Sequence, residues 1–244
     1  MSVDFLEEVY EENLVKNNMD CINLLAKASL KMSKKLDSEI RSNEFVLIGG
    51  EDAEQDCVVY NVNTKQARQL PHLQKQRCLA TAVKVGKKVY VVGGAVHAEP
   101  KSSHKSGEVL ELNEQMEWVA IPDMQEARSN CKGGLIQNFI YVTGGYNSKL
   151  LSSCERFDTY NKKWSSISDM LHARTAHGTV VYNGSLYSIG GWDGRNRSSS
   201  CERYDVRSDV WSEIAPLNQA RNGLACVVLD GNIYAIGNSC RFHI

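Results

Sequence analysis

Most of the chain alternates short apolar, β-rich runs with turn residues, and the runs recur at a regular distance. Four of them end in a double glycine, and these pairs are 44, 51 and 46 residues apart. The runs read FVLIGG, VYVVGG, IYVTGG and LYSIGG, with glycines at 49–50, 93–94, 144–145 and 190–191. A fifth run, IYAIGN, ends at Gly237 and Asn238. A period in this range indicates a repeat protein.

Within each period the pattern predicts four short antiparallel strands. Two apolar runs flank a two-residue turn, and Asn183-Gly184 and Asp230-Gly231 are typical type I′ hairpin turns. Gly86-Lys87 and Gln137-Asn138 take the same place in the other repeats. A third run carries Tyr or Phe and a fourth carries Trp. Four strands in about 47 residues match the blade of a β-propeller.

Two further residue types keep the same spacing. Trp118, Trp164 and Trp211 are 46 and 47 residues apart. We expect Trp164 and Trp211 to be buried between twisted sheets, and Trp192, which directly follows a glycine pair, to be more exposed. An arginine enters each new repeat, at Arg77, Arg128, Arg174 and Arg221.

The glycine pair, the Tyr/Phe-Asp and the Trp, in this order and spacing, resemble the kelch repeat. The resemblance covers residues 44–240 and implies an all-β kelch β-propeller segment. Only about four blades and a partial fifth fit, so an incomplete propeller, an open arc, is expected and the chain resembles a fragment of a longer protein. The expected divisions are 44–77, 78–128, 129–174, 175–221 and a partial 222–240.

Residues 1–40 lack the repeat and predict two short helices. Asp4 and Glu7 have the spacing of a capping box, and apolar residues follow at helical spacing. This segment is similar to the end of a BACK domain. The chain thus resembles the kelch-like family, in which BTB and BACK domains precede a propeller.

Composition excludes several classes of partner. With 28 Lys+Arg against 29 Asp+Glu, no basic surface for nucleic acid or an anionic membrane is expected. No apolar run approaches the roughly 20 residues of a membrane span. The acidic N-terminus does not resemble a signal peptide, and the eight cysteines form no C-x-x-C pair. Reduced thiols and a cytoplasmic location are therefore expected.

No catalytic motif is present, so the chain is expected not to be an enzyme and to bind no cofactor. The histidines have no cysteines or carboxylates at metal-ligand spacing, so no metal site is expected. Some kelch propellers are copper oxidases, and this third alternative lacks identifiable ligands. Cys154 and Cys201 recur at one repeat position, which favours a shared packing role.

The family resemblance implies a binding face lined by the residue after each glycine pair and by the arginine that enters the next blade. The implicated partner-binding residues are Tyr146, Trp192, Arg77, Arg128, Arg174 and Arg221. The arginines could equally satisfy loop carbonyl groups. Asn147 and Asp193, which follow the aromatics, are expected to form turns more than contacts.

The leading functional hypothesis is the substrate-recognition part of a BTB–kelch adaptor of a cullin-RING E3 ubiquitin ligase. The partner would be a protein substrate, and a cullin would be reached only through a BTB domain that this sequence does not contain. The alternative is an actin-binding or cytoskeletal scaffold protein. The sequence does not separate the two.

Overall fold

The computed structural model describes residues 44–50, 53–61, 63–97 and 102–237. The predicted helices at 1–40 lie outside this range. The chain divides into two compact units, Met1–Phe45 with Tyr60–Ala67 and Val46–Val59 with Arg68–Ile244. In the first unit the rings of Phe45 and Tyr60 lie 5.3 Å apart. The second unit contains β4 to β17.

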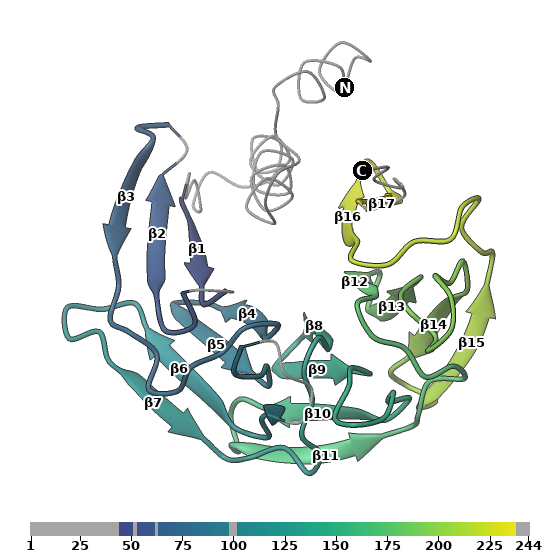
Figure 1. The fold of residues 1–244 in the computed structure, drawn as a ribbon, viewed down its shortest axis with the longest axis horizontal. Helices are drawn as coiled ribbons and strands as arrows, with labels where there is room; N and C mark the ends of the chain where they lie inside the picture. Colours follow the sequence, from purple (N-terminus) through teal and green to yellow (C-terminus); the bar gives the residue numbers. More distant parts are fainter. Residues whose placement is uncertain (1–43, 51–52, 62, 98–101, 238–244) are drawn as a thin grey trace. The chain divides into compact units, whose positions relative to one another are not determined.

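Three four-stranded antiparallel sheets, each built from consecutive strands, form the centre of the second unit (Figure 1). The first consists of β4 (Thr81–Val85), β5 (Lys88–Val92), β6 (Gly107–Glu111) and β7 (Trp118–Ile121). The second consists of β8 (Lys132–Ile136), β9 (Phe139–Thr143), β10 (Cys154–Asp158) and β11 (Lys163–Ile167). The third consists of β12 (Gly178–Tyr182), β13 (Ser185–Ile189), β14 (Cys201–Asp205) and β15 (Val210–Ile214). We call these sheets blades B, C and D.

Two smaller sheets precede and follow these blades. β1 (Glu44–Ile48), β2 (Cys57–Asn61) and β3 (Gln66–Gln69) form a three-stranded sheet in that order. β16 (Ala225–Leu229) and β17 (Asn232–Ile236) form a hairpin. The predicted all-β architecture of four-stranded propeller blades is confirmed.

The predicted two-residue turns set the register of the inner hairpins. In β12 and β13, Tyr182 pairs with Ser185 across Asn183-Gly184. Both turn residues have positive φ, 47° and 71°, as a type I′ turn requires. Two-residue turns at 86–87, 137–138 and 230–231 close the other three hairpins. Both residues of the 230–231 turn have positive φ, whereas at 86–87 and 137–138 only Gly86 and Gln137 do.

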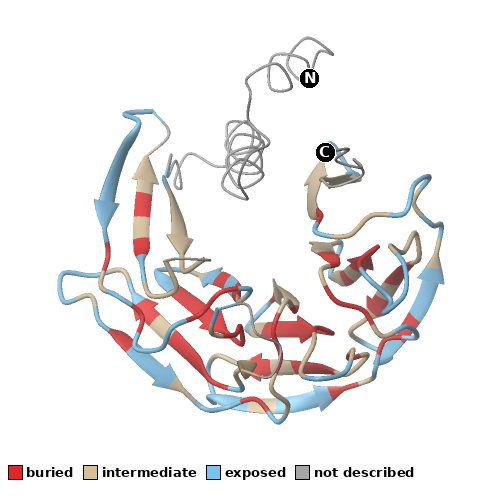
Figure 2. Cartoon of the chain, in the orientation of Figure 1, coloured by how far each residue is buried: buried red, intermediate tan, exposed pale blue. Residues whose placement is uncertain are grey.

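Burial is greatest in the middle of each blade and falls toward its outer strand (Figure 2). Four of the five residues of β5 and of β9 are buried, whereas β11 and β15 each have one buried residue. The outer strands are held by their tryptophans. Trp118 and Trp211 are 1% and 4% exposed, and Trp164 is half-buried, less covered than expected.

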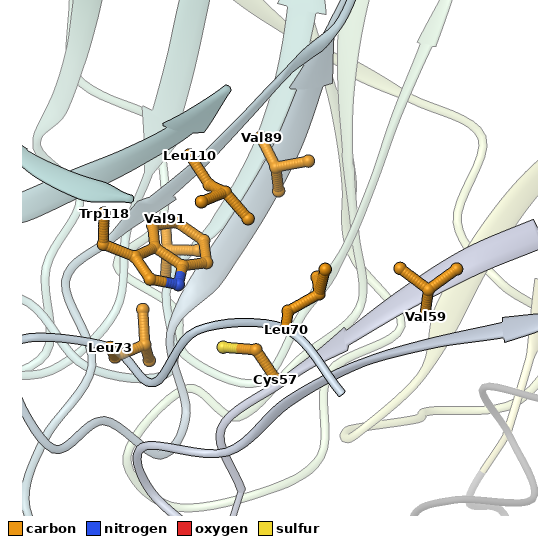
Figure 3. Packing of buried hydrophobic residues seen from close by; sticks show 8 residues of the cluster. All are labelled: Cys57, Val59, Leu70, Leu73, Val89, Val91, Leu110 and Trp118. Carbon is orange, nitrogen blue, oxygen red and sulfur yellow. The ribbon is translucent and has the colours of Figure 1, made fainter. Parts of the chain in front are cut away.

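The Trp118 cluster shows how a tryptophan joins neighbouring repeats. Its ring packs with Leu73, Leu110 and Val91 and with side chains from β2 (Figure 3). Its indole N–H donates to the carbonyl of Pro71, at 2.9 Å, in the loop that enters blade B. Trp164 and Trp211 donate in the same way to Pro122 and Ser168. Each tryptophan therefore fixes both a sheet and the loop beside it.

The innermost strands join successive blades. β8 packs against β4 and β12, and β12 packs against β16. At the ends of the entry loops a row of backbone hydrogen bonds runs from blade to blade: Asn130 N–H to Leu79 O (2.8 Å), Ala176 to Asn130 (3.2 Å) and Gly223 to Ala176 (2.7 Å). All four residues have positive φ. We call this row the backbone belt.

Candidate functional site

The end of the blades that carries the glycine pairs is the candidate binding site, because the loops after each pair and the loops entering each blade meet there. At each pair the second glycine N–H donates to the carbonyl of the arginine that enters the next blade, as in Gly145 N–H to Arg174 O at 2.9 Å. Gly144 has φ +55°, and a Cβ there would lie 2.5 Å from the Arg174 carbonyl oxygen. The glycine pair thus permits a close approach of two loops.

Three of the four repeated arginines are buried beneath these loops. Arg77, Arg128 and Arg174 are 1%, 0% and 1% exposed. In each, Nη1 donates to the carbonyl of the first glycine of the following pair, at 2.7, 2.8 and 2.6 Å. It also donates to a serine carbonyl, at 2.9 Å in every case. These bonds tie the entry loop to the loop after the glycine pair.

Each of these arginines also pairs with a buried glutamate of the blade's third strand. The Nη2–Oε1 distances are 2.9 Å to Glu108, 2.9 Å to Glu155 and 2.6 Å to Glu202. The three glutamates are 47 residues apart. Burial lowers the pKa of the Arg77 guanidinium, and Glu108 opposes that shift. The pairs keep both charges compensated in the interior.

The glutamates fix the entry loops as well. In blade C the carboxylate of Glu155 accepts the backbone N–H groups of Gln125 (2.7 Å) and Glu126 (3.1 Å). Glu108 and Glu202 receive the corresponding N–H groups of the other entry loops. Arginine, glutamate, glycine pair and entry loop therefore form one repeated network.

This network contradicts direct partner contact by Arg77, Arg128 and Arg174. Guanidinium groups this deeply buried, with donors directed at carbonyl groups and a glutamate, are not accessible to another protein. The alternative, that they satisfy loop carbonyls, agrees with the structure. Arg221 differs because it is half-buried and donates to Gly237 O at 2.8 Å, with no carboxylate paired to it in the described chain. A partner contact by Arg221 stays a prediction.

The aromatic residues after the glycine pairs have a different position. Tyr146 exchanges two backbone hydrogen bonds of 2.9 Å with Ser129, and Trp192 exchanges bonds of 2.8 and 3.1 Å with Thr175. Ala95 and Cys78 form the same bridge in blade B. Trp192 is 36% exposed and Tyr146 is half-buried, with its hydroxyl donating to Ser148 O. As expected, Trp192 is much more exposed than Trp211.

Trp192 begins a tight loop that carries two arginines. Asp193 Oδ1 accepts the N–H groups of Arg195 and Asn196, both at 2.7 Å, and these bonds from Asn196 and then Arg195 lower its pKa. Asp193 thus has the turn-forming role expected of it. Arg195 is exposed, and Arg197 forms a backbone bridge to Trp192. The exposed indole of Trp192 and the exposed guanidinium of Arg195 are therefore carried by a loop whose backbone is fixed by hydrogen bonds.

Sequence reasoning missed Arg195, Arg197 and the buried glutamates. The glutamates had a usable signal, since they keep the 47-residue spacing of the third strand. Arg195 and Arg197 had none, because they occur in one repeat only. Cys154 and Cys201 are buried at equivalent positions and each thiol donates to a carbonyl two residues earlier. Burial raises the pKa of Cys154 to about 12. The shared packing role predicted for these cysteines agrees with this geometry.

Across the residues described here, no group of three or more His, Cys, Asp or Glu side chains is arranged to hold a metal ion. The same part of the chain contains no helix with the length and hydrophobicity needed to span a bilayer.

Comparison with known proteins identifies the repeats. The KLHDC2/KLHL20/DRC7 Kelch-repeats domain family matches residues 80–244. The chain belongs to the kelch-repeat family. The Kelch repeat and BTB domain-containing protein 1 of cowpox virus (strain Brighton Red) is 24% identical over 197 residues, which are 78% of this chain and 34% of that protein. Kelch-like protein 38 of Rattus norvegicus is 30% identical over 155 residues, 61% of this chain and 27% of that protein. The chain thus spans about a quarter to a third of the length of these relatives.

Proposed function

We propose that this kelch chain binds a protein partner through the loops that follow its glycine pairs, with Trp192 as the main contact. The observation that carries the proposal is the exposed indole of Trp192 on a loop whose backbone is fixed by hydrogen bonds. Tryptophan is among the residues that dominate binding energy at protein interfaces. A fixed loop also loses little conformational entropy on binding.

Arg195 and Arg197 define the chemistry of the partner at this loop. Both lie within five residues of Trp192, and Arg195 is exposed. Guanidinium groups bind carboxylates with paired, charge-assisted hydrogen bonds. The partner segment is therefore proposed to combine an apolar side chain with acidic residues. Tyr146 and Arg221 are proposed as additional contacts on the neighbouring blades.

The biological role proposed for this surface is substrate recognition for a cullin-RING ubiquitin ligase, with the cytoplasm as the location. Supporting it are the family membership and the names of the relatives, several of which are described as containing a BTB domain. Cullin binding would require such a domain in the assembly. This role is inferred from family resemblance, because a shared fold does not by itself determine a function.

The test is a comparative affinity purification with wild-type chain, Trp192→Ala and a control, Tyr160→Ala. Tyr160 is 84% exposed in the turn between β10 and β11, at the opposite end of its blade. A partner held by wild type and by Tyr160→Ala but lost with Trp192→Ala supports the proposed surface. A partner held equally by all three proteins contradicts it.

The biological role is tested separately. If the chain serves a ubiquitin ligase, its depletion from cells should raise the level of a partner that depends on Trp192. Co-sedimentation of the purified chain with filamentous actin, lost in Trp192→Ala, would instead favour the cytoskeletal alternative.

A further inference from the structure

The interface between blades C and D contains a layer of polar side chains close to the end that carries the glycine pairs. On blade C, Lys132 of β8 lies opposite Thr143 of β9, so their side chains share one face of the sheet. On blade D, Thr179 of β12 lies opposite Ser188 of β13 in the same way. His177 directly precedes β12. We call these five residues the polar layer.

Two contacts place the polar layer inside the interface. The Thr143 hydroxyl lies 2.9 Å from Nε2 of His177, which joins blade C to the start of blade D. Leu186, on the same face of blade D as Ser188, packs with Ile136 of blade C. Thr143, His177 and Ser188 are each 0% exposed. The layer is therefore enclosed by the two blades.

The equivalent positions at the two neighbouring interfaces are mostly apolar. Between blades B and C they are Thr81, Val92, Cys131, Gly133 and Val142, and between blade D and the β16–β17 hairpin they are Gly178, Ile189, Leu224, Cys226 and Ala235. Thr81 carries the one hydroxyl among these residues, and it donates to the Cys131 carbonyl at 2.8 Å. Of these three interfaces, the one between blades C and D therefore has polar side chains at all five positions.

The interface between blades B and C also shows which members of the layer meet. A Cβ at Gly133 would lie 2.8 Å from Cγ2 of Thr81. Thr81 has the place of Lys132 in its blade, and Gly133 has the place of Thr179. Because β8 packs against β12 as it packs against β4, the repeat places the stem of Lys132 beside Thr179.

Three polar atoms of the layer are buried and have no hydrogen-bond partner among the described residues. They are Nδ1 of His177, Oγ1 of Thr179 and Oγ of Ser188. With Thr143 donating its hydroxyl proton to Nε2 of His177, Nδ1 carries the ring proton, so all three atoms can donate. A buried donor without an acceptor is unfavourable, and a ligand that accepts from these atoms removes that cost.

The layer carries a positive charge that no described carboxylate compensates. Lys132 forms no ion pair with any residue that the structure describes, and burial lowers the pKa of its amine. Burial, and then the charges of Arg174 and Lys132, hold the pKa of His177 well below its usual value. Glu202, which lies opposite Ser188, is paired with Arg174 at 2.6 Å. An anion in the layer would therefore meet hydrogen-bond donors and an unpaired cation.

We propose that the polar layer binds a small monovalent anion of the halide class, such as chloride, between blades C and D. The anion accepts hydrogen bonds from Thr179, Ser188 and His177, and Lys132 supplies the opposite charge. Lys132 and Thr179 are partly exposed and lie on the innermost strands, which gives an anion access. A water molecule would satisfy the hydroxyl groups but would leave the charge of Lys132 uncompensated. A large anion is excluded because the donors beyond these two residues are fully enclosed.

The test compares the melting temperature of the full chain in sodium chloride and in sodium gluconate at the same ionic strength, about 0.15 M. Chloride should raise the melting temperature by about 3 °C, because a ligand that binds only the folded chain stabilises it. Bromide, which is similar in size to chloride, should have the same effect, whereas gluconate is too large for the layer. Equal melting temperatures in chloride and gluconate would overturn the proposal and assign the layer to water.

Two variants and one control locate the effect of chloride. Ser188→Val gives blade D the residue that blades B and C have at this place, Val91 and Val142, and should reduce the rise to below about 1 °C. Lys132→Met removes the charge and should do the same. Lys84→Met, on an exposed lysine of β4, is the matched control and should keep the full rise. A full rise in Ser188→Val or Lys132→Met, or its loss in Lys84→Met, would show that chloride acts elsewhere.

A second measurement does not depend on unfolding. Exchange of chloride with a protein site broadens the chlorine NMR signal of the solution, and wild type should broaden it in a way that added bromide reverses. Ser188→Val should broaden the signal far less. Thr179→Ala, which introduces the residue that blade B has at this place, tests the same donors if Ser188→Val does not fold. Equal broadening by wild type and the folded variant would overturn the proposal.

Discussion

The buried arginines and the Trp192 loop lie at the same end of the blades but differ in their burial and in how far they recur from repeat to repeat. Arg77, Arg128 and Arg174 repeat in type and geometry, and all three are enclosed. The position of Trp192 varies, with Tyr146 in blade C and Ala95 in blade B, Arg195 occurs in one repeat only, and both Trp192 and Arg195 are exposed. Residues that recur in every blade hold the blades together. Residues that vary between the repeats are the ones that we propose for contact with another protein.

The largest effect that would sharpen this contrast is expected from Arg128→Ala. It leaves Glu155 buried without its partner and releases the carbonyl groups of Gly144 and Ser153. Breaking a buried pair in this way costs about 3–5 kcal/mol. Urea unfolding followed by tryptophan fluorescence measures the loss. A change below about 1 kcal/mol would mean that the network does not hold the blades.

A smaller loss is expected from Gly144→Ala. The new Cβ would meet the Arg174 carbonyl oxygen at 2.5 Å, and φ of +55° strains any residue other than glycine. Strain of this kind costs about 1–3 kcal/mol. The control is Gly184→Ala, where φ is also positive, at +71°, but where no atom lies within 4 Å of the new Cβ. Equal loss of stability in the two variants would assign the cost to φ alone.

His177 should make stability depend on pH. It is fully buried among repeated residues, where Cys131 and Leu224 occupy the equivalent positions, and its Nε2 lies 2.9 Å from the Thr143 hydroxyl. Burial, then the charges of Arg174 and Lys132, hold its pKa well below 6.5. Between that lowered pKa and about 6.5 the unfolded chain binds more protons than the folded chain.

Stability is therefore full above about pH 6.5 and falls as the pH is lowered through this window. Denaturant unfolding at pH 7.5 and pH 5 tests the effect, with His177→Cys as the matched variant. The variant should lose less stability than wild type over this interval. An equal loss in both proteins would assign the pH dependence to other groups.

The smallest effect on stability is expected from Trp192→Ala, within about 0.5 kcal/mol, since the side chain is exposed and fills no core site. Trp211→Ala is its control, and emptying that core site should cost about 3–5 kcal/mol. The order should be reversed for partner binding: Trp192→Ala should lose it, whereas the folded fraction of Trp211→Ala should keep it. Similar melting temperatures for the two variants would remove the distinction between repeated and exposed residues.

Much of the fold could be predicted because the same strand and turn signals recur in several repeats. The spacing of the glycine pairs and the Asn183-Gly184 type of turn predicted the strands, and both agree with the structure. The arginines were predicted less well. A sequence shows that a cation recurs, but its burial depends on Glu155 and its equivalents from another strand.

The backbone belt has a consequence for the evolution of the sequence. Its links use only the N–H and carbonyl groups of Leu79, Asn130, Ala176 and Gly223, so the side chains at these positions take no part in the joint. The four residues already range from a branched aliphatic to none at all. Although their positive φ favours glycine, the side chains at these positions can change while the hydrogen bonds that join the blades are kept, so substitutions here can alter the surface without altering the scaffold.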